Sequence, residues 1–181
     1  LEIRGAGNIL GAEQHGHIES VGYDMYIKLL NAAVLEETGA EPEKAKAECT
    51  VDLKFSAFIP ESYIKSPQTR IEIYKKISHI QTGYDLDDVA DELLDRFGDL
   101  PPSVENLLDV AYIRALGERI GIRKISQRDS VIEIYPEQCG IQSLVQLASS
   151  NRDRMSLVPG SSPKILYKMK QGDRPLGYIK N

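Results

Sequence analysis

Residues 103–134 read SVENLLDVAYIRALGERIGIRKISQRDSVIEI, and the spacing of their apolar residues changes at Gly121. Before this glycine the apolar residues recur at helical intervals, at Val104, Leu107, Leu108, Ala111, Ala115, Leu116 and Ile120. After it the helical spacing stops, and a pattern expected of half-buried strands follows at Ile122, Ile125, Val131, Ile132 and Ile134. We expect Ser103 to cap the helix, and residues 127–129 to form the turn of a β-hairpin.

The chain before this stretch indicates a strand and two helices. Residues 49–55 alternate between apolar and polar side chains and predict a half-buried strand. Ser66-Pro67 opens a helix that stops near Gly83, because proline is tolerated in a first helical turn. We expect this helix to bury one stripe, formed by Ile71, Tyr74, Ile77 and Ile80.

A second helix is predicted over residues 85–97, with Gly98 at its end. Its apolar residues are expected to face inward: Leu86, Val89, Ala90, Leu93, Leu94 and Phe97. Its acidic residues are expected to face solvent: Asp87, Asp88, Asp91 and Glu92.

Beyond the hairpin, the pattern predicts a short helix over 141–149 and strands over 155–158 and 164–169. Lysines alternate with apolar residues in the last strand, which favours an edge strand whose charges discourage aggregation; they are Lys164, Lys168 and Lys170. At the other end of the chain, residues 21–37 have helical spacing. The predicted fold class is therefore α+β, with helices packed on a small antiparallel sheet, preceded by a glycine-rich loop and a long helix.

Composition and charge narrow the class of protein. The chain has 181 residues, of which 41% are hydrophobic, and this suits one or two domains with a real core. No apolar run is long enough to cross a membrane and no signal peptide is visible, so we expect a cytoplasmic protein with no membrane partner. The two cysteines, Cys49 and Cys139, lie far apart and are expected to be free, partly buried thiols.

Charge is distributed unevenly along the chain. Residues 1–46 carry 4 basic and 8 acidic side chains, and residues 47–120 carry 8 and 14. Residues 121–181 carry 10 basic and 5 acidic side chains. The acidic residues 1–120 are unsuited to binding DNA, because binding to phosphates depends on cationic side chains. The basic last third could contact a nucleic acid or an acidic protein surface.

Residues with catalytic or metal-binding spacing are not found. The only histidines are His15, His17 and His79, and none has a cysteine or carboxylate at a convincing metal spacing. The acids of residues 85–91 lack the glycine turn and the distal glutamate of a calcium loop, so a solvated helix face is the better interpretation. We therefore predict no catalytic residue, no metal site and no cofactor in this chain.

The first fourteen residues, LEIRGAGNILGAEQ, predict a strand that ends at Ile3 and leads into a glycine-rich loop. Its glycines, Gly5, Gly7 and Gly11, are spaced one residue too widely for a dinucleotide fingerprint, and Ala12 stands where a phosphate-binding loop needs lysine. Two interpretations remain open: a plain glycine-rich connector, and a motif whose directed polar groups are Arg4 and Gln14.

This loop, followed by Val-Gly-Tyr-Asp-Met-Tyr from Val21 and a helix, resembles the TRG motif shared by bacterial transcription-repair coupling factors and RecG-type helicases. Later stretches resemble the coupling factors in particular, and they occur in the order that this family shows: residues 18–30, 59–64, 70–77 and 93–101. The resemblance spans roughly residues 1 to 127. It identifies the chain as the C-terminal part of such a factor, with the TRG motif and the C-terminal regulatory domain.

The resemblance implies a division of the chain. Residues 1–39 would be the end of the motor domain with the TRG motif and a lever helix, residues 40–47 a linker, and residues 48–181 the C-terminal regulatory α+β domain. The residues that match the coupling motif are Arg4, Gly5, Gly7, Gly11 and Gln14. In the family, this motif couples ATP hydrolysis to DNA translocation.

The resemblance also implies a function and partners. Coupling factors are ATP-dependent DNA translocases, related to helicases, that displace stalled RNA polymerase from duplex DNA and recruit nucleotide-excision repair. The C-terminal domain autoinhibits the repair-recruiting module by hiding its surface for the excision damage-recognition protein. ATP and magnesium would bind in the upstream motor of the parent protein, so this part alone should be inactive. A stand-alone protein-interaction adaptor unrelated to DNA repair is the alternative.

Overall fold

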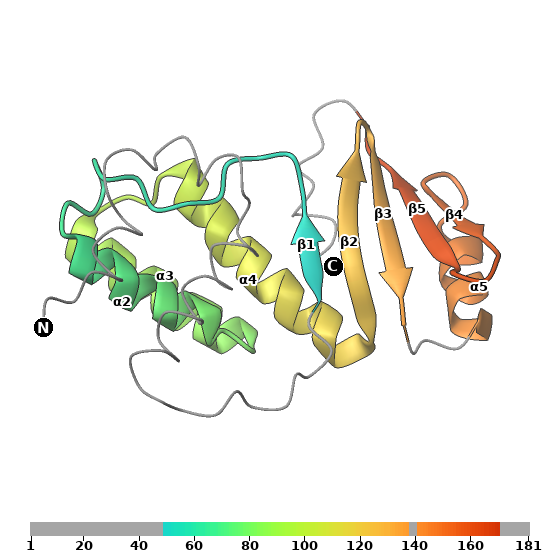
Figure 1. Cartoon of the computed structure of the whole chain (residues 1–181), viewed down its shortest axis with the longest axis horizontal. Coiled ribbons are helices and arrows are strands. Elements are labelled where there is room, and N and C mark those ends of the chain that lie inside the picture. Colours follow the sequence, from blue (N-terminus) through green and yellow to red (C-terminus); the bar gives the residue numbers. More distant parts are fainter. Residues whose placement is uncertain (1–48, 138–140, 171–181) are drawn as a thin grey trace, which may run out of the picture. The chain divides into compact units, whose positions relative to one another are not determined.

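The computed structural model describes residues 49–137 and 141–170 (Figure 1). These residues form two compact units: a first unit of residues 55–111, and a second unit of residues 49–54 and 112–170 without 138–140. The elements, in chain order, are β1 (Thr50–Asp52), α2 (Pro67–Ser78), α3 (Gly83–Phe97), α4 (Pro102–Ile120), β2 (Ile122–Arg128), β3 (Val131–Pro136), α5 (Ile141–Ser150), β4 (Met155–Val158) and β5 (Lys164–Lys168).

This order of helices and strands confirms the predicted α+β class. The glycine-rich loop and the long helix predicted before residue 48 lie outside the described residues, and so do the boundaries of the predicted linker at residues 40–47. The division into motor end, linker and regulatory domain therefore remains a prediction.

In the first unit, α2 and α3 each begin with a side-chain cap. The Ser66 hydroxyl accepts a hydrogen bond from Thr69 N, and Pro67 occupies the first turn, as predicted. At α3, Thr82 and Asp85 form a capping box: Thr82 Oγ1 accepts from Asp85 N, and Asp85 accepts from Thr82 N at 2.8 Å. Because Thr82 provides this cap, α3 starts at Gly83. α2 ends at Ser78, earlier than predicted, with His79 as its C-cap.

The core of the first unit is aliphatic, with one buried tyrosine. Tyr74 was expected on the inward stripe and is 2% exposed, whereas Ile73 is fully buried in place of the predicted Ile71, which is half-buried. Leu94 was predicted to face inward but is 42% exposed. The buried apolar residues are Ile59, Ile64, Ile73, Tyr74, Ile77, Ile80, Leu93, Val104, Leu107, Leu108, Val110 and Ala111.

The loop before α2 is held by polar contacts from inside the unit. The Tyr74 hydroxyl accepts a 2.9 Å hydrogen bond from Ile59 N, so a buried backbone donor is satisfied. The Tyr63 hydroxyl donates to the carbonyls of Leu93 and Gly98, at 3.2 and 3.0 Å. The buried Arg70 donates to the Ile64 and Lys65 carbonyls, at 2.7 and 3.2 Å. These bonds fix residues 59–65 on α2 and on the end of α3.

The start of α4 differs from the prediction. The helix begins at Pro102, and Ser103 is not its cap: the Pro101 carbonyl accepts from Val104 N and Glu105 N, at 2.8 and 3.1 Å. The Ser103 carbonyl instead accepts from Phe58 N. The proline pair explains the difference, since Pro102 has no N–H to satisfy and its fixed φ suits a first helical turn.

The second unit contains a five-stranded sheet in the order β1-β2-β3-β5-β4. Three of its four pairings are antiparallel, as predicted, but β1 pairs with β2 in parallel, with Val51 opposite Ile125. The sheet is therefore mixed. β1 is also shorter than the predicted strand over residues 49–55. A parallel pair needs a long crossover connection, and residues 53–121 provide it here.

The hairpin between β2 and β3 turns at Asp129-Ser130, because Arg128 pairs with Val131. Asp129 has a φ of 54°, a conformation that aspartate tolerates better than most residues. The turn is thus slightly later than the predicted residues 127–129.

The prediction that β5 is an edge strand was wrong. β5 pairs with β3 on one side and with β4 on the other, so Lys164 and Lys168 lie on an interior strand and Lys170 lies beyond its end. In the described sheet the edges are β1 and β4, which are both very short.

One face of the sheet packs against the second half of α4 and against α5. Ile125, Ile132 and Ile165 on this face are at most 2% exposed. Gly117 allows α4 to come close to β1: a Cβ added there would lie 2.5 Å from Cys49 Sγ. Cys49 was predicted to be a partly buried thiol, and it is a thiol that is almost fully buried, at 1% exposure. Cys139 lies outside the described residues.

This close approach can be tested by the change in stability that a Gly117→Ala substitution causes. Alanine favours helix formation by up to about 1 kcal/mol over glycine, but overpacking a core costs about 1–3 kcal/mol. We expect Gly117→Ala to lower the free energy of unfolding by about 1–2 kcal/mol in urea titrations. In a Cys49→Ala background, which lacks the sulfur, the same change should cost at least about 1 kcal/mol less. Equal costs in both backgrounds would contradict the steric explanation.

Candidate interaction surfaces

The residues predicted to form the coupling motif lie outside the described residues. Arg4, Gly5, Gly7, Gly11 and Gln14 all precede residue 49, so the structure neither brings them together nor separates them. Their role stays a prediction.

The first unit carries an acidic helix surface, which we call the α3 acidic face. Tyr84 and Leu94, which are 84% and 42% exposed, lie on this surface with four exposed aspartates. Positions three, four, seven, ten and eleven residues after Tyr84 share one side of a helix. The face therefore consists of Tyr84, Asp87, Asp88, Asp91, Leu94 and Asp95.

The outward orientation predicted for Asp87, Asp88 and Asp91 is confirmed, but Glu92 was placed wrongly. Glu92 is half-buried and faces α2, where Lys76 Nζ donates to both of its oxygens, at 2.7 and 2.6 Å. Arg96 donates to it as well, at 2.5 Å. These hydrogen bonds lower the pKa of Glu92, and the bond from Lys76 has a larger effect than the bond from Arg96. This carboxylate therefore joins α3 to α2.

Asp85 also has a structural role. Its carboxylate accepts hydrogen bonds from Gln81 N and Thr82 N, and these bonds lower the pKa of Asp85. Over residues 55–111 the unit carries 5 basic and 11 acidic side chains, a net charge of −6. With Asp85 and Glu92 engaged, the four aspartates of the α3 acidic face remain for contacts with a partner.

The second unit contains an apolar groove of about 710 Å³ between α4, α5 and the sheet. Ile120 and Leu147 on its rim are 56% and 45% exposed. At one end, Arg154 donates a 2.8 Å hydrogen bond to the Tyr167 hydroxyl. The lining residues are Ile113, Leu116, Gly117, Ile120, Ile122, Ile125, Ile132, Ile134, Leu147, Asn151, Asp153, Arg154, Met155 and Tyr167.

Neither a metal-ligand cluster nor a membrane-spanning helix is found in the described part of the chain. Within it, no group of three histidine, cysteine or acidic side chains is placed to hold a metal ion. No helix among these residues is long and apolar enough to span a bilayer. The described residues of the second unit carry 11 basic and 6 acidic side chains, a net charge of +5, so the two units are oppositely charged.

Sequence patterns could find only part of these surfaces. The aspartates of α3 were predicted to face solvent, but Tyr84 was not singled out as exposed and Leu94 was assigned to the core. A helical stripe wide enough to include both Leu93 and Leu94 fits the spacing, and only packing shows which one is buried. The groove was missed because its lining comes from α4, the α5 region and four strands, which no local pattern connects.

The fold and these surfaces define an α+β domain that offers two oppositely charged units. The TRCF domain family model matches residues 53–143, and the chain therefore belongs to the TRCF domain family. A transcription-repair-coupling factor of Staphylococcus epidermidis is 45% identical over 135 residues, which are 74% of this chain and 12% of that protein. The corresponding protein of Staphylococcus aureus strain USA300 is 44% identical over 136 residues, again 12% of its length.

The fold is also found in a solved structure. A crystal structure of the C-terminal domain of transcription-repair coupling factor superposes with a TM-score of 0.66, covering 75% of this chain and 88% of that chain. At 22% sequence identity, this likeness establishes a shared fold. The chain thus spans about 12% of the length of the curated relatives that it matches.

The Glu92 contacts predict a pH-dependent contribution to stability. Because its pKa is lowered in the folded chain, Glu92 stabilises the fold above its unfolded pKa, and this contribution is lost as the pH falls through the folded pKa. Glu92→Gln should lower the free energy of unfolding by about 0.5–1 kcal/mol at pH 7 and have less effect near pH 3. Urea titrations at both pH values would measure this.

The matched control is Glu72→Gln, since Glu72 is exposed on α2. This substitution should change stability by less than about 0.5 kcal/mol. A Glu92→Gln effect that is the same at both pH values would show that its cause is packing and not the charge.

Proposed function

We propose that this chain is the C-terminal regulatory part of a transcription-repair coupling factor, a cytoplasmic ATP-dependent DNA translocase. The parent protein would displace stalled RNA polymerase from duplex DNA and recruit nucleotide-excision repair, with ATP and magnesium bound in its upstream motor. Membership of the TRCF domain family and the names of the curated relatives support this proposal. A stand-alone adaptor has no comparable support.

In this proposal the chain has three parts, as the sequence resemblance implies. Residues 1–39 end the motor and carry the coupling motif, residues 40–47 are a linker, and residues 48–181 are regulatory. The regulatory part docks on the repair-recruiting module of the same parent and hides its binding surface for the damage-recognition protein. It acts by binding and not by catalysis.

The observation that carries the regulatory proposal is the α3 acidic face. Tyr84 and Leu94 lie ten residues apart, which is about 15 Å along a helix, and four aspartates lie between and beside them. Exposure of the Tyr84 and Leu94 side chains to water does not stabilise the fold. These side chains can, however, provide apolar contacts to a protein partner. The aspartates select a basic partner surface and repel acidic ones.

Autoinhibition follows if this face binds only the closed state of the parent. A contact that exists in one of two states shifts the population toward that state by its own interaction free energy. Weakening the contact therefore raises the fraction of open parent molecules, which can bind the damage-recognition protein. Ion pairs at an exposed interface also weaken with salt, since charges are screened over about 8 Å at physiological ionic strength.

The first functional prediction concerns this face. In the full-length parent, Asp88→Lys with Asp91→Lys should increase capture of the damage-recognition protein in pull-downs at low salt. The expected gain is several-fold, because two attractive charges become repulsive. High salt should bring the unmodified parent toward the same level of capture.

The control is Glu72→Lys with Glu105→Lys, which makes the same change of net charge at two exposed positions of the first unit outside the α3 acidic face. It should leave capture unchanged. Equal capture by the parent, the control and the double variant at every salt concentration would rule out docking through α3.

The second functional prediction concerns the coupling motif. In the parent, Arg4→Ala or Gln14→Ala should largely spare ATP hydrolysis but abolish translocation on DNA and displacement of RNA polymerase. The motif joins the motor to the element that moves, and loss of a charge-assisted hydrogen bond costs about 1.5–3 kcal/mol, enough to uncouple a two-state joint. Phosphate release and triplex displacement would measure the two activities. A parallel loss of both would indicate a role at the nucleotide.

A further inference from the structure

The two faces of the sheet in the second unit differ in chemistry. Ile125, Ile132 and Ile165 point toward α4 and α5, and successive side chains of a strand point to opposite faces. The residues next to them in the strands therefore lie on the other face, which we call the open face. No helix among the described residues contributes to it.

Four cations lie on the open face, but they are not equivalent. Lys164 donates a 2.8 Å hydrogen bond to Glu133, and its ammonium group lies 5.6 Å from the centre of the Tyr135 ring. Glu133 raises the pKa of Lys164, which is the effect expected of an ion pair. Lys164 and Glu133 therefore largely neutralise each other. The cations that remain for a partner are Lys124, Arg128 and Lys168.

Two of these cations frame an aliphatic side chain. Arg128 pairs with Val131, and Val131 pairs with Lys168, so the three residues form one row across β2, β3 and β5. Because neighbouring strands are about 4.8 Å apart, the Cα atoms of Arg128 and Lys168 lie about 10 Å from each other. Both are exposed, whereas Val131 between them is half-buried.

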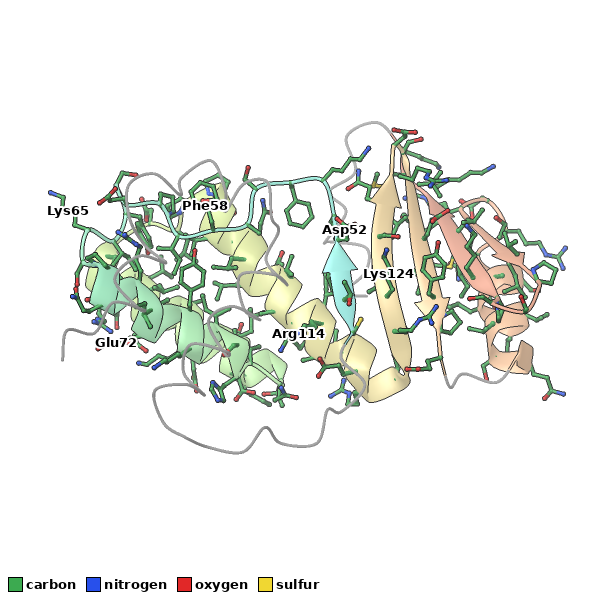
Figure 2. The ribbon with its side chains drawn as sticks, in the orientation of Figure 1. Asp52, Phe58, Lys65, Glu72, Arg114 and Lys124 are labelled. Carbon is green, nitrogen blue, oxygen red and sulfur yellow. The ribbon has the colours of Figure 1, made fainter. Side chains whose placement is uncertain are left out.

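The neighbouring row has the same character. Leu166 on β5 lies opposite Glu133 on one side and Ser156 on the other, and it is half-buried. On β2, Lys124 lies opposite Thr50 of β1, two residues along that strand from Asp52; Figure 2 labels Asp52 and Lys124. The open face thus has aliphatic side chains near its centre, cations around them, and two acids.

This mixture favours a protein partner over a nucleic acid. Phosphates would gain from the cations but nothing from Val131 and Leu166, and Asp52 would repel them. The Tyr135 ring is engaged with Lys164, and its hydroxyl donates to Glu133 at 2.6 Å, so it is not placed to stack on a base. Apolar centres with charged rims are typical of protein interfaces.

We propose that the open face binds an acidic protein segment that also carries aliphatic side chains. The carboxylates of the segment pair with Arg128, Lys168 and Lys124, while its aliphatic side chains contact Val131 and Leu166. This inference goes beyond the autoinhibitory role and does not rest on it, because it concerns the second unit and a partner of opposite charge.

The test measures binding of labelled probes to the full 181-residue chain by fluorescence anisotropy at low salt. The first probe is a peptide of alternating glutamate and leucine, and the second replaces each leucine with serine at equal charge. The third probe is an oligothymidylate of similar length. The glutamate–leucine peptide should bind several-fold more tightly than the other two.

Two double variants with equal charge change locate the site. Arg128→Glu with Lys168→Glu should weaken binding of the leucine peptide by about tenfold or more, as expected for the loss of two ion pairs. The control, Arg119→Glu with Arg152→Glu, changes two exposed cations outside the open face and should have little effect. Leu166→Ala should reduce the preference for leucine over serine. Circular dichroism would verify that every variant is folded.

Three results would overturn the proposal. Equal weakening by the control variant would mean that net charge alone attracts the peptide. Equal binding of the serine peptide would mean that Val131 and Leu166 contribute nothing. Tighter binding of the oligothymidylate would make the open face a nucleic-acid surface.

Discussion

The structure depends on α4, which must bury apolar side chains in the cores of both units. Val104, Leu107 and Leu108 are buried in the first unit, and Ile113 and Ala115 in the second. A helix that serves one core has one apolar stripe, but α4 also buries Val110 and Ala111, next to each other in sequence. Its side chains must therefore fit two different sets of neighbours. The close approach at Gly117 belongs to the core of the second unit, where Cys49 lies against the helix.

Local signals in the sequence predicted most of the elements. The helix of residues 141–149, the strand of residues 155–158 and the start of α2 were placed within a residue or two, because capping residues and periodicity act locally. Pairing between strands that are far apart in the sequence was harder to predict. The parallel contact of β1 with β2, and the interior place of β5, depend on which strands meet after long connections. The lysines of β5 were thus assigned to an edge, although lysines on the open face of an interior strand produce the same alternation.

The candidate surfaces show a similar limit. The alternation of acids and apolar residues in α3 predicted a solvated acidic side, and four aspartates lie there. The same pattern could not separate Glu92, which Lys76 and Arg96 bind, from Asp91, which is exposed. A single helix turn can hold one carboxylate for stability and another for a partner, and only the neighbouring helix decides between them. Family resemblance predicted the coupling motif, and this stays a prediction because its residues precede those described.

Opposite net charges on the two units have a consequence for any larger protein that contains them. A basic partner is attracted to the first unit and repelled by the second, and an acidic partner experiences the reverse. Each unit also carries aliphatic or aromatic side chains among its charges, as at Tyr84 and Leu166, so that attraction over distance is followed by short-range contact. Salt weakens the attraction between charges at such surfaces, but it does not abolish binding, since apolar burial does not weaken with ionic strength. Because the two proposed contacts lie in different units, each can be changed by substitutions that leave the other intact.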